Sequence, residues 1–256
     1  MLLVIDVGNT NTVLGLYEGE TLRAHWRLAT YQDRTPDEWS ITIDGLLQMK
    51  NIAGDSVDAA IMASVVPPLT GVLAQMIEQR FGIKPLQVGP GIKTGIKILY
   101  DNPLEVGADR IVNSVAAYAR VAGAAIIVDF GTATTFDALS SHAEYLGGII
   151  VPGLQIAADG LSARAAKLPR VEVRKPPRLI GRNTIHSIQS GLYYGYTTMI
   201  NGLLARLRAE MKDNPKVLVT GGLNAQLIAE LEGVDLIEPN LTLDGLRIIY
   251  GKNSGG

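Results

Sequence analysis

The chain has 256 residues, of which 47% are hydrophobic, and its formal net charge is −2. This composition supports a buried core, excludes disorder as the main state, and offers no excess of positive charge for nucleic acid or an anionic membrane. The absence of cysteine excludes disulfides, thiolate metal sites and cysteine nucleophiles, and it fits a reducing cytoplasm.

The apolar run before Asp6 is too short for a signal peptide and lacks a basic segment, so it predicts a strand. No apolar run approaches the roughly 20 residues that span a bilayer. We therefore expect a soluble, cytoplasmic protein without nucleic-acid or membrane partners.

The first half of the chain predicts three strands followed by alternating helices and strands. Continuous apolar runs indicate buried strands, and apolar residues three or four positions apart indicate helices. Glu18-Gly19-Glu20 is a typical turn between strands, and Thr35-Pro36 is a typical helix start. The expected strands are 2–7, 12–17, 22–28 and 58–65, and the expected helices are 36–49 and 69–81.

The second half repeats this order after a connection at 89–103 that is rich in Gly, Pro and Lys. A Pro- and Arg-rich stretch at 169–182 predicts an exposed loop. The expected strands are 124–129, 133–139, 145–151, 216–220 and 234–237, and the expected helices are 106–122, 154–166, 183–211, 223–232 and 241–250. We therefore expect an α/β protein with two similar lobes, 1–105 and 106–256, around a cleft.

One short sequence occurs twice, and each copy ends in an aspartate and a glycine turn. Residues 4–10 read VIDVGNT, and residues 127–135 read IVDFGTATT. A carboxylate at the C-terminal end of a buried strand projects into the crevice where α/β sheets bind ligands. Gly8 would let the backbone approach a phosphate, and residues 9–12 would supply donors. One copy alone is equally well explained as an ordinary turn. The pair indicates a site for a polyphosphate and its cation.

Neither copy contains the Gly-Lys-Ser/Thr of a P-loop, so amides and a bound cation would have to neutralise phosphate charge. A third glycine turn, Thr220-Gly221-Gly222, would let a base or ribose lie against the backbone. Taken alone, this turn is better explained as a loop between a strand and a helix.

Asp109 and Arg110 stand in the first turn of the helix expected at 106–122. The helix dipole favours an ionised carboxylate there, and a carboxylate beside a phosphoryl donor could accept the proton of a substrate hydroxyl. Arg110 could hold a carboxylate or phosphate through its forked donors. Without the surrounding motifs, dipole compensation and local pairing explain both residues better.

Other polar residues carry weaker signals. Tyr100 precedes an Asn-Pro turn, and Asn183 or Thr184 suits the N-cap of the following helix. The three histidines are scattered, so we expect no transition-metal site. The sequence also lacks the G-x-S-x-G turn of a serine hydrolase.

Together these motifs resemble those of the actin, sugar-kinase and heat-shock ATPase superfamily, and within it those of the type III pantothenate kinases. The matching strings occur in family order from residue 4 to beyond residue 220, and only the ordered set is specific. They are VIDVGNTNTVLGLY, YDNPLEVGADRIVN, IVDFGTATTFD, YLGGIIVPG, GRNTIHSIQSGLYYG and VTGGLNA. The resemblance implies two tandem ribonuclease-H-like lobes and the ATP-dependent phosphorylation of pantothenate to 4′-phosphopantothenate, the first step of coenzyme A biosynthesis.

The resemblance also implies roles for individual residues. Asp109 would be the general base, and Thr132 would contact ATP, which brings Mg²⁺. Asp129 would hold the monovalent cation, K⁺ or NH₄⁺, that the family requires. Thr184 would reach the pantothenate pocket of the partner subunit in a homodimer. The first ATP-binding turn would comprise Asp6, Val7, Gly8, Asn9, Thr10, Asn11, Thr12 and Val13. The substrate pocket would include Tyr100, Gly107, Ala108, Asp109 and Arg110.

Val13 stands where some family members carry a lysine, so the cation would take a larger share of phosphate neutralisation here. Two other functions stay open. One is a different small-molecule kinase or phosphatase of the same fold, against which the combined YDNP and GADR string argues. The other is a non-catalytic transcription-accessory protein, against which the missing basic stripe and the retained catalytic positions argue.

Overall fold

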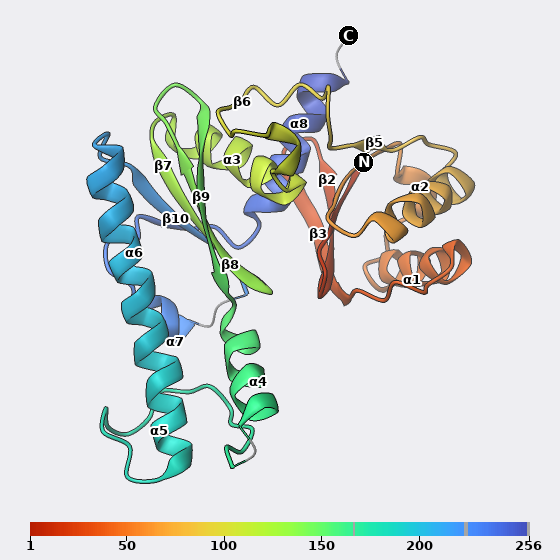
Figure 1. The fold of residues 1–256 in the computed structure, drawn as a ribbon. Helices are drawn as coiled ribbons and strands as arrows, with labels where there is room; N and C mark the ends of the chain where they lie inside the picture. Colours follow the sequence, from red (N-terminus) through yellow and green to blue (C-terminus); the bar gives the residue numbers. More distant parts are fainter. Residues whose placement is uncertain (166, 223–224, 255–256) are drawn as a thin grey trace. The chain divides into compact units, whose positions relative to one another are not determined.

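The computed structural model describes residues 1–165, 167–222 and 225–254. The chain forms two compact units, each built on one β-sheet with helices packed against it (Figure 1). The first unit comprises Met1–Ile96, Asp101–Ala116 and the chain from Leu241 onward. The second comprises Lys97–Tyr100 and Ala117–Asn240.

The sheet of the first unit has the strand order β3-β2-β1-β4-β5. β1 is central: it pairs antiparallel with β2 and parallel with β4 along its whole length. Asp6 therefore lies on a strand that is hydrogen-bonded on both sides. The strands are β1 (Leu2–Val7), β2 (Asn11–Glu18), β3 (Thr21–Ala29), β4 (Ala59–Ser64) and β5 (Leu86–Gln87).

Helices cover both faces of this sheet, which explains the continuous apolar sequence of β1. Leu3, Ile5 and Val7 pack against α1 (Pro36–Met49) and α2 (Pro67–Phe81) on one face. Val4 faces the other side, together with Val112 of α3 (Ala108–Val121) and Leu246 of α8 (Leu241–Asn253). Because side chains alternate along a strand, Asp6 lies on this second face.

The sheet of the second unit has the order β11-β10-β7-β8-β9-β6. β7 has the place that β1 has in the first sheet, since it pairs antiparallel with β8 and parallel with β10. The repeated sequence therefore corresponds to a repeated strand arrangement. The strands are β6 (Lys97–Ile98), β7 (Ala125–Phe130), β8 (Ala133–Leu139), β9 (Glu144–Pro152), β10 (Lys216–Gly221) and β11 (Leu236–Ile237).

One long helical rod packs on this second sheet, and Figure 1 shows it running on from the sheet alongside α4 (Leu154–Arg164). The rod consists of α5 (Thr184–Ser190), a π-helical turn at Gly191–Gly195 and α6 (Tyr196–Met211). Tyr196, Ile200 and Leu204 of α6 bury the face of β7 that carries Val128. Asp129, next along β7, therefore lies on the opposite face.

The expected elements largely agree with the observed ones, and the differences have physical causes. The helix expected at 183–211 changes to π geometry over Gly191–Gly195. The helix expected to begin at 69 begins at Pro67, because proline fits the first helical turn. The two-residue strands β5 and β6 are too short to give a sequence pattern. α7 (Ala225–Ile228) covers part of the helix expected at 223–232, and residues 223–224 and 166 lie outside the described residues.

The compact units do not coincide with the expected division at 105/106. α8 packs on the first sheet although it comes last in the chain, and α3 contributes its N-terminal part to the first unit. α3 and α8 approach closely at Gly245, where an added Cβ would clash with the carbonyl oxygen of Val112. Within the described part of the chain, none of the helices combines the length and apolar character needed to cross a bilayer.

This close approach predicts that Gly245→Ala lowers the free energy of unfolding by about 1–3 kcal/mol, because overpacking displaces α8 from α3. Urea denaturation measures the effect. Gly251→Ala in the same helix is the matched control, since an added Cβ there meets no atom within 4 Å. That variant should be neutral or stabilised by up to about 1 kcal/mol through helix propensity. Equal destabilisation by both variants would contradict the packing described.

Candidate active site

The first glycine turn joins β1 to β2 in the first unit, and hydrogen bonds hold it rigid. Gly8 N–H donates to Asn11 O at 3.0 Å, which closes the turn. Thr30, at the end of β3, donates from its backbone N–H to Thr10 O at 2.9 Å and from Oγ1 to Gly8 O at 2.7 Å. Thr30 was not among the predicted site residues. Its only local signal is a hydroxyl residue after a strand, whose role depends on the β2–β3 pairing.

The predicted ATP-binding residues of this turn differ in what they can offer a ligand. Val7 and Thr12 are fully buried, and the Thr12 hydroxyl lies 2.9 Å from the Thr30 hydroxyl. Thr12 thus helps to fix the turn. Asn9 and Thr10 are exposed at its tip. A phosphate could therefore reach this turn at residues 9 and 10.

The second glycine turn has the same construction in the second unit. Gly131 N–H donates to Ala133 O at 3.1 Å, and Gly153 N–H donates to Thr132 O at 3.1 Å. An added Cβ at Gly153 would clash with the Thr132 carbonyl. Only glycine therefore allows the start of α4 to pack on this turn. Thr132 itself is exposed. The bond from Gly153 fixes the Thr132 backbone at the surface of the unit.

Asp129 lies on β7 between two hydroxyl residues, because Thr135 of β8 and Thr220 of β10 are its partners in register. Gly221 follows with φ +92°, and an added Cβ there would lie 2.5 Å from Asp129 Oδ1 and 2.6 Å from Phe130 O. This glycine lets the backbone at the end of β10 come close to the Asp129 carboxylate and to the Phe130 backbone. Carboxylate and carbonyl oxygens are the ligands that hard cations prefer. Among the described residues, no three His, Cys, Asp or Glu side chains gather as a metal cluster.

Asp109 stands at the second position of α3 and is half-buried. Its Oδ1 accepts a hydrogen bond from the backbone N–H of Arg110 at 2.9 Å. Burial raises the pKa of the Asp109 carboxyl, and the Arg110 N–H and guanidinium offset this only in part. An added Cβ at Gly107 would lie 2.5 Å from Asp109 Oδ1, so the glycine before the helix makes room for the carboxylate. The Arg110 side chain is buried, with 8% exposure.

The remaining predicted site residues belong to the second unit. Tyr100 directly follows β6, and its ring centroid lies 6.3 Å from that of Tyr145. Thr184 is the exposed first residue of α5. Asn183 caps this helix, because its Oδ1 accepts from His186 N–H at 2.8 Å. The structure thus assigns the cap to Asn183 and leaves Thr184 without a capping role.

The structure brings the predicted residues together in two sets. The first unit holds Asp6–Val13 and Gly107–Arg110, with Asp6 on the sheet face that α3 covers. The second unit holds the other residues, namely Tyr100, Asp129, Thr132 and Thr184.

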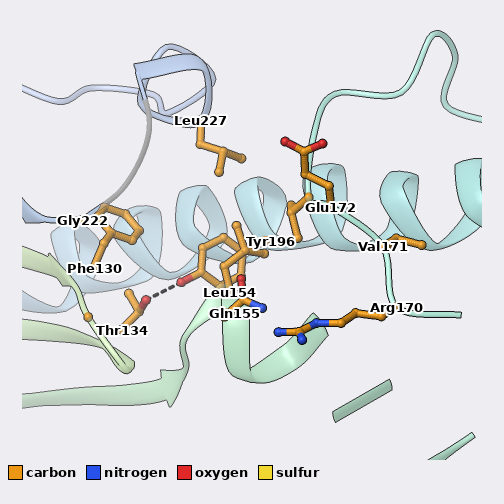
Figure 2. A pocket seen from close by; sticks show the side chains of 12 residues that line it. Phe130, Thr134, Leu154, Gln155, Arg170, Val171, Glu172, Tyr196, Gly222 and Leu227 are labelled. Atoms are coloured by element: carbon orange, nitrogen blue, oxygen red, sulfur yellow. Dashed lines mark hydrogen bonds between the residues drawn. The ribbon is translucent and has the colours of Figure 1, made fainter. Parts of the chain in front are cut away.

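A pocket of about 620 Å³ opens beside the second turn, and the glycines of both turns in this unit line it (Figure 2). Tyr196 reaches across from α6 and shares a hydrogen bond with the buried hydroxyl of Thr134. Gln155 and Arg170 carry the polar groups on one side, whereas Leu227 is apolar. The lining residues are Phe130, Gly131, Thr134, Leu154, Gln155, Arg170, Val171, Glu172, Val173, Tyr196, Gly222 and Leu227.

Comparison with solved structures supports the two-lobe fold of the sugar kinases. A candidate transcriptional activator of the Baf family from Campylobacter jejuni aligns with a TM-score of 0.60 at 20% identity, covering 99% of this chain and 100% of that one. The ROK hexokinase of Thermus thermophilus aligns with a TM-score of 0.52 at 13% identity, covering 100% and 99%. At these identities the likeness concerns the fold alone.

Relatives of much higher sequence identity show the family as well as the fold. The family model described as type III pantothenate kinase matches residues 2–206. A type III pantothenate kinase of Geobacter sulfurreducens is 53% identical over 253 residues, which cover 99% of each chain. The ordered glycine turns, the Gly107–Arg110 segment and this full-length identity agree. The chain therefore belongs to the type III pantothenate kinase family.

Proposed function

We propose that this chain transfers the γ-phosphoryl group of ATP to a hydroxyl of pantothenate, with Asp109 as the general base. The products are ADP and 4′-phosphopantothenate, and the reaction is the first step of coenzyme A biosynthesis. The observation that carries the role of Asp109 is its half-buried carboxylate with a raised pKa at the start of α3. A base is more effective when its pKa lies closer to the working pH, provided that it stays ionised there.

Phosphoryl transfer needs positioning and charge neutralisation more than covalent chemistry. The first turn, with Gly8 at its bend, would hold phosphate oxygens through the amides of residues 9 and 10. Thr132 would contact the nucleotide from the second turn. A divalent metal accompanies ATP in the reaction, and we propose Mg²⁺. Arg110 and Tyr100 would bind pantothenate together with Gly107 and Ala108.

The pocket beside the second turn would receive the base and ribose of ATP. Gly131 and Gly222 line it, and glycine lets a flat ring lie against the backbone. The hydroxyl groups of Thr134 and Tyr196 form a hydrogen bond with each other. The wall that these two residues offer to the base is therefore mainly apolar.

A monovalent cation, K⁺ or NH₄⁺, would be held by Asp129. Support comes from the close approach of Gly221 to the Asp129 carboxylate and from the hydroxyl residues on both neighbouring strands. When bound, the cation would add positive charge near the phosphates, where the first turn has Val13 in place of a lysine.

The active form would be a homodimer in which Thr184 reaches the pantothenate pocket of the partner. Several large apolar side chains of this part of the second unit are exposed, and exposed apolar patches are typical of protein interfaces. They belong to α4, the preceding loop and α5, and comprise Ile156, Leu161, Leu179, Ile180 and Ile185. We also propose a cytoplasmic location, which the absence of cysteine suits.

Asp109→Asn should lower kcat by at least about 100-fold in an ADP-release assay with pantothenate, because a positioned base contributes on this order. Its melting temperature should rise at pH 7–8, where folding buries an ionised carboxylate, and the gain should vanish as the pH falls towards the ordinary Asp pKa of about 4. Asp37→Asn, the exposed second residue of α1, is the matched control and should show neither effect. Near-normal turnover of Asp109→Asn would remove Asp109 as the base.

Replacing K⁺ by Na⁺ at constant ionic strength should reduce turnover strongly. Gly221→Ala should raise the K⁺ concentration needed for half-maximal activity, because its Cβ would crowd Asp129 Oδ1. Gly222→Ala is the matched variant, since its Cβ would lie at an ordinary 3.6 Å from Phe130 O, and its K⁺ requirement should be unchanged. Turnover that is indifferent to the cation would contradict the site at Asp129.

Mixing Asp109→Asn and Thr184→Ala subunits should restore part of the activity that each variant lacks alone. The heterodimer would contain one site with both residues intact if Thr184 acts across the interface. Heterodimer formation is checked with subunits of different mass. A confirmed heterodimer without recovered turnover would indicate that each site is complete within one chain.

A further inference from the structure

A β-bulge in β9 lies against the side chain of Tyr100. Ala138 of β8 pairs with Gly147, whereas the next residue, Leu139, pairs with Tyr145, so Leu146 is an extra residue in β9. Gly147 has φ +123°, and an added Cβ there would lie 3.6 Å from Cε2 of the Tyr100 ring. The ring therefore rests on a glycine backbone. Bulges commonly re-aim side chains next to active sites.

Tyr145 supports the same ring from within the unit. The two ring planes are tilted by 49°, and Tyr145 is fully buried. The backbones are linked as well, because Leu99 N–H donates to Tyr145 O at 2.9 Å in the extension of the β6–β9 pairing. The position of Tyr100 thus depends directly on that of Tyr145.

A buried carboxylate anchors Tyr145 in turn. Tyr145 Oη donates to Asp137 Oδ1 at 2.8 Å, and Asp137 is fully buried on β8. Thr135 Oγ1 lies 3.4 Å from Asp137 Oδ2 on the same strand face. Burying a carboxylate is costly, and a phenylalanine beside a leucine would fill the same space without that cost. A polar pair fixes the orientation of the ring, which apolar packing alone does not.

We infer that Tyr145 and Asp137 are positioning residues that set the orientation in which Tyr100 meets pantothenate. The inference rests on the proposed role of Tyr100 in the substrate pocket. It assigns a task to the last residue of the IVDFGTATTFD string, Asp137, which the proposed chemistry does not use.

The test compares Tyr145→Phe with the wild-type enzyme in steady-state kinetics. This variant keeps the ring and removes the anchoring hydroxyl, so KM for pantothenate should rise about three- to tenfold, as expected for the loss of one buried hydrogen bond. KM for ATP and kcat should stay within about twofold. Asp137→Asn keeps an acceptor for the Tyr145 hydroxyl and should therefore keep KM for pantothenate near the wild-type value.

Tyr17→Phe is the matched control for a purely structural effect. Tyr17 is also fully buried, and its Oη donates to Asp244 Oδ1 at 2.6 Å, but it belongs to the first unit whereas Tyr100 belongs to the second. This variant should lower the melting temperature without changing KM for pantothenate. Should Tyr145→Phe not fold, the double variant with Asp137→Leu removes the buried carboxylate as well, and the same rise in KM is expected.

Tyr100→Ala tests the role of Tyr100 in pantothenate binding separately from the positioning role of Tyr145 and Asp137. If it leaves KM for pantothenate unchanged, the assignment of Tyr100 to the substrate pocket fails, and the inference fails with it. If it raises KM for pantothenate while Tyr145→Phe and the double variant do not, only the positioning role is overturned. Equal increases of KM for ATP and pantothenate in Tyr145→Phe would also overturn it, because they would indicate a general structural defect.

Discussion

A central strand of each sheet carries an aspartate as its last residue but one, and the backbone of this strand is hydrogen-bonded on both sides. The remaining features depend on this constraint. β1 and β7 each have one antiparallel and one parallel neighbour, so the backbones of Asp6 and Asp129 are held by hydrogen-bonded strands on both sides. The turns that follow are closed by the N–H groups of Gly8 and Gly131. A fixed carboxylate beside an exposed turn can position a polyphosphate and its cation without rearrangement at the moment of reaction.

Glycine recurs where the chain packs closely against a polar oxygen atom. Gly107 makes room for the Asp109 carboxylate, and Gly221 does so for Asp129. Gly153 allows α4 to pack on the Thr132 carbonyl. Each glycine loses more conformational entropy on folding than another residue would. In return, its backbone can approach a polar group more closely than that of a residue with a Cβ. At Asp109 the result is a partly desolvated carboxylate with a raised pKa, which lowers the stability of the folded chain where the carboxylate is ionised.

The features that could be predicted are local in sequence. Hydrophobic periodicity and helix-start signals identify the strand before Asp6, the strand before Asp129 and the helix that begins beside Asp109. The features that were missed depend on residues distant in sequence. Thr30 fixes the first turn only because β3 pairs with β2. α8 joins the first unit because Leu243 and Leu246 pack on the face of the sheet that carries Val4, with Gly245 close to α3. Such contacts leave no periodic signal.

The amino-acid sequence was sufficient for the duplicated strand and turn, the α/β class and the resemblance to the type III pantothenate kinases, since all of these reside in short strings whose order is preserved. The support beneath Tyr100 could come only from the folded chain. Asp137 and Tyr145 are eight positions apart, and the bulge at Leu146 shifts the register between the strands that carry them. A register shift of one residue changes which side chains face each other, and no periodic pattern specifies where it occurs.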